Sequence, residues 1–250
     1  MLQKRTVFII IVALSTLLSG CGMNRDPITS ESEGIWNHFF VYPFSWVLTN
    51  LADLFQGSYG MAIIFMTFVI RLCLLPLFMK QQKSTVAMRE LQPEMEKLKE
   101  KYDTKNQQQA QKFQQEMMQL YSKNGVNPAA GCLPVLIQMP ILMAFYFAIV
   151  RTEEIANHSF LWLDLGQPDP LFILPVAAGA AMFLQTKITM KDTPQQMKVM
   201  MYLMPVMIIA AGAALPSALS LYWFTGGIFM IFQSMYFSKY RARTETASDQ

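Results

Sequence analysis

Long apolar segments without charged residues alternate with polar, charged segments along this chain. Residues 199–238 contain no Asp, Glu, Lys or Arg, and neither do residues 124–150. Uncharged apolar runs of about 18 or more residues are typical of helices that cross a membrane. The pattern therefore predicts an all-α, polytopic membrane protein. Its five transmembrane helices are expected at residues 59–79, 131–150, 170–188, 199–215 and 219–237.

The longest uncharged run is expected to fold back on itself. As one helix, its 40 residues would extend about 60 Å at 1.5 Å per residue. That length is about twice the 30 Å hydrocarbon core of a bilayer. We expect the turn at Leu215-Pro216-Ser217, because proline cannot continue the hydrogen bonding of a preceding helix.

The composition excludes several classes of protein. Apolar residues make up 53% of the chain, charged residues only 15%, and the mean hydropathy is +0.27. Soluble domains carry about 25% charged residues. A secreted disulfide scaffold, a nucleic-acid-binding domain and most soluble enzymes are therefore excluded. The net charge of +3 is small, so the placement of the charges is more informative than their sum.

The placement of basic residues predicts the orientation in the membrane. Residues 80–127 contain nine Lys or Arg, and residues 186–198 and 238–250 contain three each. Residues 22–58 and 151–169 contain one each. Because basic loops stay in the cytoplasm, we expect the tail at 238–250 to lie in the cytoplasm and the segments at 21–58 and 151–169 to lie outside.

The amino terminus has the features of an export signal. Lys4 and Arg5 precede an apolar stretch at residues 6–18, as in a secretory signal peptide. Leu18-Ser19-Gly20-Cys21 follows and resembles a bacterial lipobox. We expect residues 1–20 to be removed and Cys21 to carry a lipid such as palmitate at the outer face of a bacterial plasma membrane. The alternative is an uncleaved signal anchor followed by a cysteine that is there by chance.

Two further amphipathic regions are predicted outside the spans. The segment 34–55 is expected to form an interfacial helix outside the cell, kinked by Pro43, with its polar residues, including Ser45, on the opposite face. Residues 80–128 are expected to form a cytoplasmic hairpin with arms at 84–104 and 106–123. Pro93 either kinks the first arm or marks its first turn. The apolar stripe of the interfacial helix comprises Trp36, Phe39, Phe40, Phe44, Val47, Leu48, Leu51 and Phe55.

Arg71 is the residue on which the functional prediction depends. It lies eight residues before the end of the first predicted span, about 12 Å from that end. An arginine near mid-bilayer is unfavourable by about 2.5–3.5 kcal/mol on insertion scales. The five span interiors contain no Asp or Glu as an acidic counterpart. The sequence therefore predicts a hydrated, cationic cavity that receives an anion; the alternative is a buried structural ion pair.

Other polar and aromatic residues of the spans are candidates for the lining of this cavity. Thr67 lies one helical turn before Arg71, and a single glutamine occurs in each of three other spans. Any one of these residues could instead bond a neighbouring backbone carbonyl. The candidates are Arg71, Thr67, Gln138, Gln185, Tyr222, Trp223 and Gln233.

The sequence offers no chemistry of an enzyme and no cofactor site. It lacks a GxxxxGK[ST] phosphate-binding loop, a nucleophile–base pair and a metal cluster. Cys73 and Cys132 have no CxxC spacing and are expected to pack as small apolar residues. An anion channel or transporter that uses Arg71 remains an alternative, as does an intramembrane enzyme, which would need paired acids or a Ser–His arrangement.

The chain resembles the YidC/Oxa/Alb family of membrane protein insertases, in its five-span bacterial lipoprotein form. The resemblance covers residues 18–240 and rests on motifs in a fixed order. They are the lipobox, Thr67-Phe68-Val69-Ile70-Arg71 running to Pro76, the charged hairpin, Asn127-Pro128, Gly131-Cys132-Leu133-Pro134, Gln138-Met139-Pro140 and Leu221-Tyr222-Trp223.

The resemblance implies an insertase and chaperone with a hydrophilic groove open to the cytoplasm. Thr67, Arg71, Gln138, Gln185 and Trp223 match groove positions of the family. The implied substrates are nascent membrane proteins with short, often acidic amino-terminal tails. Cooperation with the Sec translocon and contact with the ribosome are left open, the latter because the tail after Ser238 is short and only modestly basic. The lipid bilayer surrounds the groove. No nucleic acid beyond the ribosome is expected, and a monomer is sufficient for a groove within one chain.

Overall fold

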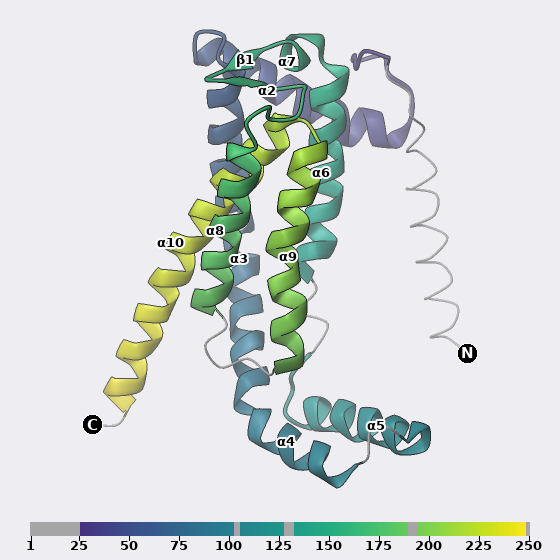
Figure 1. Ribbon diagram of the computed structural model, residues 1–250, viewed down its shortest axis with the longest axis vertical. Coiled ribbons are helices and arrows are strands. Elements are labelled where there is room, and N and C mark those ends of the chain that lie inside the picture. Colours follow the sequence, from purple (N-terminus) through teal and green to yellow (C-terminus); the bar gives the residue numbers. More distant parts are fainter. Residues whose placement is uncertain (1–25, 103–105, 128–132, 190–194, 249–250) are drawn as a thin grey trace. The chain divides into compact units, whose positions relative to one another are not determined.

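The computed structural model describes residues 26–102, 106–127, 133–189 and 195–248 (Figure 1). The predicted signal peptide, the lipidation site Cys21 and Cys132 lie outside the described residues. The elements in chain order are a π-helix η1 (Asn37–Val41), α2 (Tyr42–Leu54), α3 (Tyr59–Glu90), α4 (Gln92–Lys101), α5 (Gln107–Lys123), α6 (Leu133–Arg151), α7 (Glu153–Ala156), β1 (Ser159–Phe160), β2 (Leu163–Asp164), α8 (Ile173–Thr189), α9 (Gln195–Ala214) and α10 (Ser217–Ser248).

The five longest apolar segments are helical over most of their predicted ranges. α3 and α10 contain stretches that are long and apolar enough to cross a membrane. α6, α8 and α9 contain shorter apolar stretches at Leu136–Arg151, Ile173–Thr189 and Met201–Ala214. The number of spans stays a prediction. The 40-residue run is interrupted between Ala214 and Ser217, where Pro216 lacks the N–H needed to continue α9.

A short β-hairpin lies within the loop predicted at residues 151–169. β1 and β2 pair antiparallel, with Ser159 opposite Asp164 and Phe160 opposite Leu163. The chain is predominantly helical, as predicted, and this short hairpin was not predicted. Strands of two residues are too short for a detectable alternation, and the connecting pair Leu161-Trp162 is not an Asn-Gly or Asp-Gly turn signal.

The chain divides into two compact units, and each of the five long helices contributes a portion to both. Unit 1 consists of the described residues up to Thr67 with Pro140–Gly179 and Ile208–Thr225. Unit 2 consists of Phe68–Met139, Ala180–Met207 and the described residues from Gly226. Among described residues, the largest fully buried apolar side chains lie in unit 1: Val41, Leu48, Ile63, Phe145, Ile149, Ile155, Leu163, Leu165, Leu219 and Tyr222.

The amphipathic segment of unit 1 has a buried face. Its buried positions are Val41, Ser45, Leu48 and Ala52, which share one side of η1 and α2 at helical spacing. Phe39 of the predicted apolar stripe is 66% exposed, and the position of this helix at the membrane interface stays a prediction. Ser45 is buried because its hydroxyl is hydrogen-bonded to that of Thr152, with 2.6 Å between the oxygens. A partner 107 residues away gives no signal in local periodicity.

The Ser45–Thr152 hydrogen bond leads to a stability prediction. Ser45→Ala should lower the free energy of unfolding by about 1–3 kcal/mol, because it leaves the buried Thr152 hydroxyl without this partner. Adding Thr152→Val should recover much of the loss, since both polar groups are then absent. Thermal unfolding of purified protein would measure both changes, and equal melting temperatures for Ser45→Ala and wild type would contradict the prediction.

The charged segment of unit 2 forms two packed helices, α4 and α5 (Figure 1). The first arm is not continuous from residue 84 as predicted, because α3 extends to Glu90 and α4 begins at Gln92. Pro93 lies in the first turn of α4. A proline ring clashes with the carbonyl four residues earlier and has no N–H, so Pro93 ends α3 and begins a new helix. Pro93 was predicted either to kink a helix or to mark its first turn, and the structure has it in the first turn.

Candidate functional site

Arg71 is buried in α3, with 5% of its surface exposed. Its guanidinium lies against the bare backbone of Gly226 in α10. A Cβ at position 226 would be 2.6 Å from Nη2 and 2.9 Å from Nε of Arg71. The rings of Phe68 and Phe229 meet edge to face beside this contact, with centroids 5.9 Å apart. The structure thus places the one charged residue of the predicted span interior against a glycine that the sequence analysis did not single out.

The buried residues of the long helices in unit 2 are small or polar. Unit 1 has large apolar side chains at its centre, whereas the described part of unit 2 has none of comparable size buried on α3, α6, α8, α9 or α10. Thr186 is 2% and Ser234 is 8% exposed. Among the residues of these helix portions whose burial the structure describes, the buried ones are Arg71, Ala181, Thr186, Pro205, Gly226, Gly227 and Ser234.

Large apolar side chains of unit 2 lie instead on the exposed surface. Leu72 is 56%, Leu203 is 56%, Val206 is 59% and Phe232 is 68% exposed. Soluble monomers rarely expose extensive contiguous apolar surface, because water solvates it poorly. An apolar exterior around a polar interior is the arrangement expected for helices in lipid that enclose a hydrophilic space. Cys73 belongs to this exterior.

Gln138 lines a small cavity within unit 2. The cavity has a volume of about 10 Å³, roughly the room that one water molecule needs. Gln81 of α3 is the other polar residue of its lining. The remaining wall is apolar and is formed by Leu74, Leu77, Phe78, Leu133 and Ile137.

Two further predicted glutamines lie on other helices of unit 2. Gln185 of α8 is half-buried, and its amide donates a hydrogen bond of 3.2 Å to the Thr189 hydroxyl. Gln233 of α10 is also half-buried and adjoins the buried Ser234. Gly226 is a direct neighbour of the Arg71 guanidinium, and the convergence of the glutamines on this arginine stays a prediction.

The three other predicted site residues belong to unit 1. Thr67 is 1% exposed, and its hydroxyl donates a 2.6 Å hydrogen bond to the Ile63 carbonyl. Tyr222 is 1% exposed and packs on Phe145, with ring centroids 5.1 Å apart. Trp223 is half-buried. Thr67 therefore bonds a carbonyl of its own helix, which was the alternative to lining the cavity. Tyr222 contributes to the apolar core.

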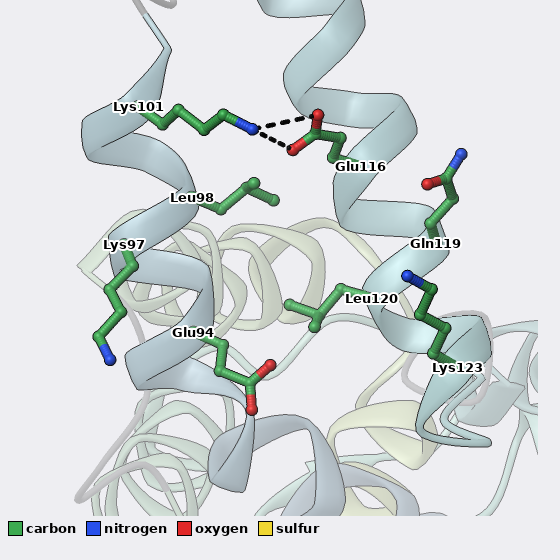
Figure 2. Close-up of a pocket in the computed structure, with 8 residues that line it drawn as sticks. All are labelled: Glu94, Lys97, Leu98, Lys101, Glu116, Gln119, Leu120 and Lys123. Atoms are coloured by element: carbon green, nitrogen blue, oxygen red, sulfur yellow. Dashed lines mark hydrogen bonds and ion pairs between the residues drawn. The ribbon is translucent and has the colours of Figure 1, made fainter.

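A cleft of about 500 Å³ lies between α4 and α5. Figure 2 shows Leu98 and Leu120 pointing into the space between the helices, with Lys101 and Glu116 joined at one end. Lys101 Nζ lies 3.2 Å from Glu116 Oε2, and the Tyr102 hydroxyl donates a 2.6 Å hydrogen bond to Glu116 Oε1. The cleft has an apolar floor with charged edges, and its other lining residues are Glu94, Lys97, Gln119 and Lys123.

The contacts of Glu116 predict a measurable pKa change. The Tyr102 hydrogen bond, followed by that of Lys101, holds the pKa of Glu116 below its usual value. Tyr102→Phe and Lys101→Met should therefore each raise this pKa. A carbon-13 NMR titration of the Glu116 carboxyl would measure both shifts. An unchanged pKa in Tyr102→Phe would show that the hydrogen bond does not hold the carboxylate.

The lowered pKa also fixes the pH range in which this contact stabilises the hairpin. The folded state favours the carboxylate form, so the contribution is complete above the ordinary glutamate pKa of about 4.3. It is lost as the pH falls through the lowered folded-state value. At neutral pH the two arms are therefore joined by an ionised Glu116.

Comparison with known proteins places the chain in a family. Residues 50–245 match the model of the 60Kd inner membrane protein family. The chain is 59% identical over 241 residues to the membrane protein insertase YidC of Alkalihalophilus pseudofirmus, covering 94% of each protein. It is 51% identical over 239 residues to the membrane protein insertase MisCA of Bacillus subtilis, covering 94% of this chain and 92% of that one.

A solved structure supports the same assignment. The chain is similar to an active YidC insertase whose crystal structure resolves the first transmembrane domain, with a TM-score of 0.63 and 31% sequence identity. The match covers 82% of this chain and 47% of that one, so this chain spans about half of the crystallised protein. The resemblance inferred from the sequence motifs is confirmed, and this membrane protein belongs to the 60Kd inner membrane protein family, which includes the YidC insertases.

Proposed function

We propose that this chain is a membrane protein insertase and chaperone, which uses Arg71 in a hydrophilic groove to draw the polar tail of a nascent protein partway into the membrane. One observation carries the proposal: the buried residues described on the long helices of unit 2 are Arg71 and small or polar residues, while large apolar side chains of these helices are exposed. The names of the relatives support the same activity.

The charge of Arg71 gives the groove its preference for substrates. At an effective dielectric constant of about 20, two opposite unit charges 4 Å apart attract by about 4 kcal/mol, compared with about 1 kcal/mol in water. An acidic tail is therefore attracted into the groove more strongly than to an arginine on the surface. Gln138, Gln185 and Gln233 of unit 2 are proposed to line the path.

Insertion then proceeds without a chemical reaction. The groove shortens the apolar layer that the polar tail must cross, which lowers the barrier for moving charge into the membrane. The apolar segment of the substrate moves from the groove into lipid, driven by the hydrophobic effect. The membrane potential adds about 2.3 kcal/mol per charge and 100 mV for an acidic tail that moves outward. No bond is made or broken, so the chain is not an enzyme in this proposal.

The proposed topology places the substrate-receiving elements in the cytoplasm. Five helices cross the plasma membrane, with a lipid-modified Cys21 outside and the tail at residues 238–250 inside. The α4–α5 hairpin then faces the cytoplasm, where its cleft receives the incoming chain before Arg71 does. A single copy is sufficient for this cycle. Cooperation with the Sec translocon or the ribosome is compatible with it.

Reconstitution in liposomes tests the proposed function. Purified protein should insert a small single-span client with an acidic tail, measured by protection of the tail from external protease. A parallel assay should detect no flux of chloride or other small anions. Empty liposomes and liposomes with heat-inactivated protein are the controls. Anion flux without client insertion would overturn the proposal in favour of a channel or transporter.

A further inference from the structure

The turn of the β-hairpin holds a bulky apolar residue where glycine is normally required. Leu161 is the first of the two residues between β1 and β2, its φ is +58°, and it is 74% exposed. In two-residue hairpins with a positive φ at this position, glycine is favoured because side chains are strained there. Leu161 therefore combines an unfavourable backbone with an unfavourable exposure to water.

A second position of unit 1 repeats this combination. Phe172 has a φ of +56° and is 52% exposed, directly before the first residue of α8, Ile173. Leu171 beside it is 59% exposed, and Trp162 of the hairpin turn is 41% exposed. We call Leu161, Trp162, Leu171 and Phe172 the apolar tips.

The buried carboxylate of Asp169 links the two pairs of apolar tips, the pair in the hairpin turn and the pair before α8. Asp169 is 1% exposed, and its Oδ1 accepts hydrogen bonds from the Trp162 indole at 3.2 Å and from the Leu171 amide at 3.0 Å. Its Oδ2 accepts a 2.7 Å hydrogen bond from the Leu174 amide in the first turn of α8. Asp169 therefore fixes the hairpin turn relative to the start of α8. The apolar tips are exposed in the folded structure.

The apolar tips lie next to the first residues of two apolar helices, α3 and α8. The ring of Phe160 packs directly on Gly60 in the first turn of α3, which fixes the hairpin to the beginning of that helix. Phe172 precedes α8, whose exposed Ile173 and Val176 continue the apolar surface of the tips. Tryptophan and other aromatic residues are enriched where membrane helices meet the headgroup region.

We infer that the apolar tips insert into the lipid interface at the end of the molecule where α3 and α8 begin, and so fix the depth of unit 1 in the bilayer. Lipid is the occupant that fits, because the tips continue the exposed apolar face of a helix in a membrane protein. Lipid also removes the cost of exposing Leu161 and Phe172 to water.

Fluorescence of Trp162 tests this inference. The chain has four tryptophans, so replacing Trp36, Trp46 and Trp223 by phenylalanine leaves Trp162 alone. In liposomes of lipids brominated near the headgroup end of the acyl chain, Trp162 should lose fluorescence and be protected from acrylamide in water. The matched control carries Trp162→Phe and Glu153→Trp, because Glu153 is an exposed polar position of the same loop.

Two results would overturn the inference. If acrylamide quenches Trp162 as strongly as it quenches the control tryptophan, Trp162 lies in water. If neither acrylamide nor the brominated lipid quenches Trp162, the side chain is covered by protein. The measurement uses no client, so its outcome is independent of insertase activity.

Glycine variants separate the role of the side chains from that of the turn. Leu161→Gly with Phe172→Gly keeps the positive φ values without strain, so the fold should be retained or stabilised. If the tips anchor unit 1, this variant should lose bromolipid quenching of Trp162 and gain acrylamide quenching. Unchanged quenching with a native melting temperature would show that other elements set the depth, and would contradict the inference.

Discussion

Replacing Arg71 by alanine is expected to reduce the insertion of clients with acidic tails by about tenfold, which corresponds to about 1.4 kcal/mol. The reason is the loss of the positive charge of a buried side chain, since only 5% of the surface of Arg71 is exposed. Attraction of a carboxylate to such a charge exceeds the same attraction in water several-fold. Protease protection of the inserted tail in proteoliposomes would measure the change.

The matched variants of Arg71 separate charge from structure. Arg71→Lys keeps a point charge without the planar guanidinium and should retain part of the activity. Clients with neutral tails should be affected less by Arg71→Ala, which also shows that the variant is folded. Equal activity of Arg71→Ala and wild type for acidic and neutral tails would remove Arg71 from the mechanism.

Gly226→Ala is expected to reduce the insertion of acidic-tail clients roughly threefold to tenfold, equivalent to about 0.6–1.4 kcal/mol. The new methyl group would lie 2.6 Å from Nη2 of Arg71, so the guanidinium must move away from α10. The end of an arginine side chain moves easily, and the helix itself has no reason to unfold. The same proteoliposome assay, with acidic and neutral tails compared, would measure the effect.

A double variant shows whether Gly226 acts through Arg71. In an Arg71→Ala background the space is already open, so adding Gly226→Ala should cause no further loss. Gly227→Ala is the control, because its methyl group would lie 3.1 Å from the Ala181 Cβ and not against Arg71. That variant should affect acidic and neutral tails alike. Additive losses for Gly226→Ala and Arg71→Ala would contradict a positioning role for Gly226.

The helical framework could be predicted because its signals are local. Charge-free length and composition indicate apolar helices, and Pro93 and Pro216 mark helix boundaries. The interruption at Pro216 follows from the missing N–H of one residue. Pro93 was harder, because a proline can kink a helix or begin one. Only the structure, in which α3 ends at Glu90 and α4 begins at Gln92, decides between these outcomes.

The candidate site could be predicted only in part. Arg71 was found because a charge in an apolar segment is unfavourable and needs a reason. Gly226 was missed, since a glycine gains its role from the side chain that approaches it from another helix. The signal that could have found it is the pair Gly226-Gly227 within an otherwise bulky apolar run, because small residues mark close approaches of membrane helices.

The sequence by itself determined that this is a helical membrane protein with an arginine inside a predicted span, and its motifs were sufficient to indicate the family. These conclusions need only composition, periodicity and residue order along the chain. The tertiary structure decided that Ser45 is buried on Thr152, that Arg71 rests on Gly226, and that Leu161 occupies a strained turn. Such features depend on contacts between distant segments or on backbone angles, and neither leaves a periodic pattern in the sequence.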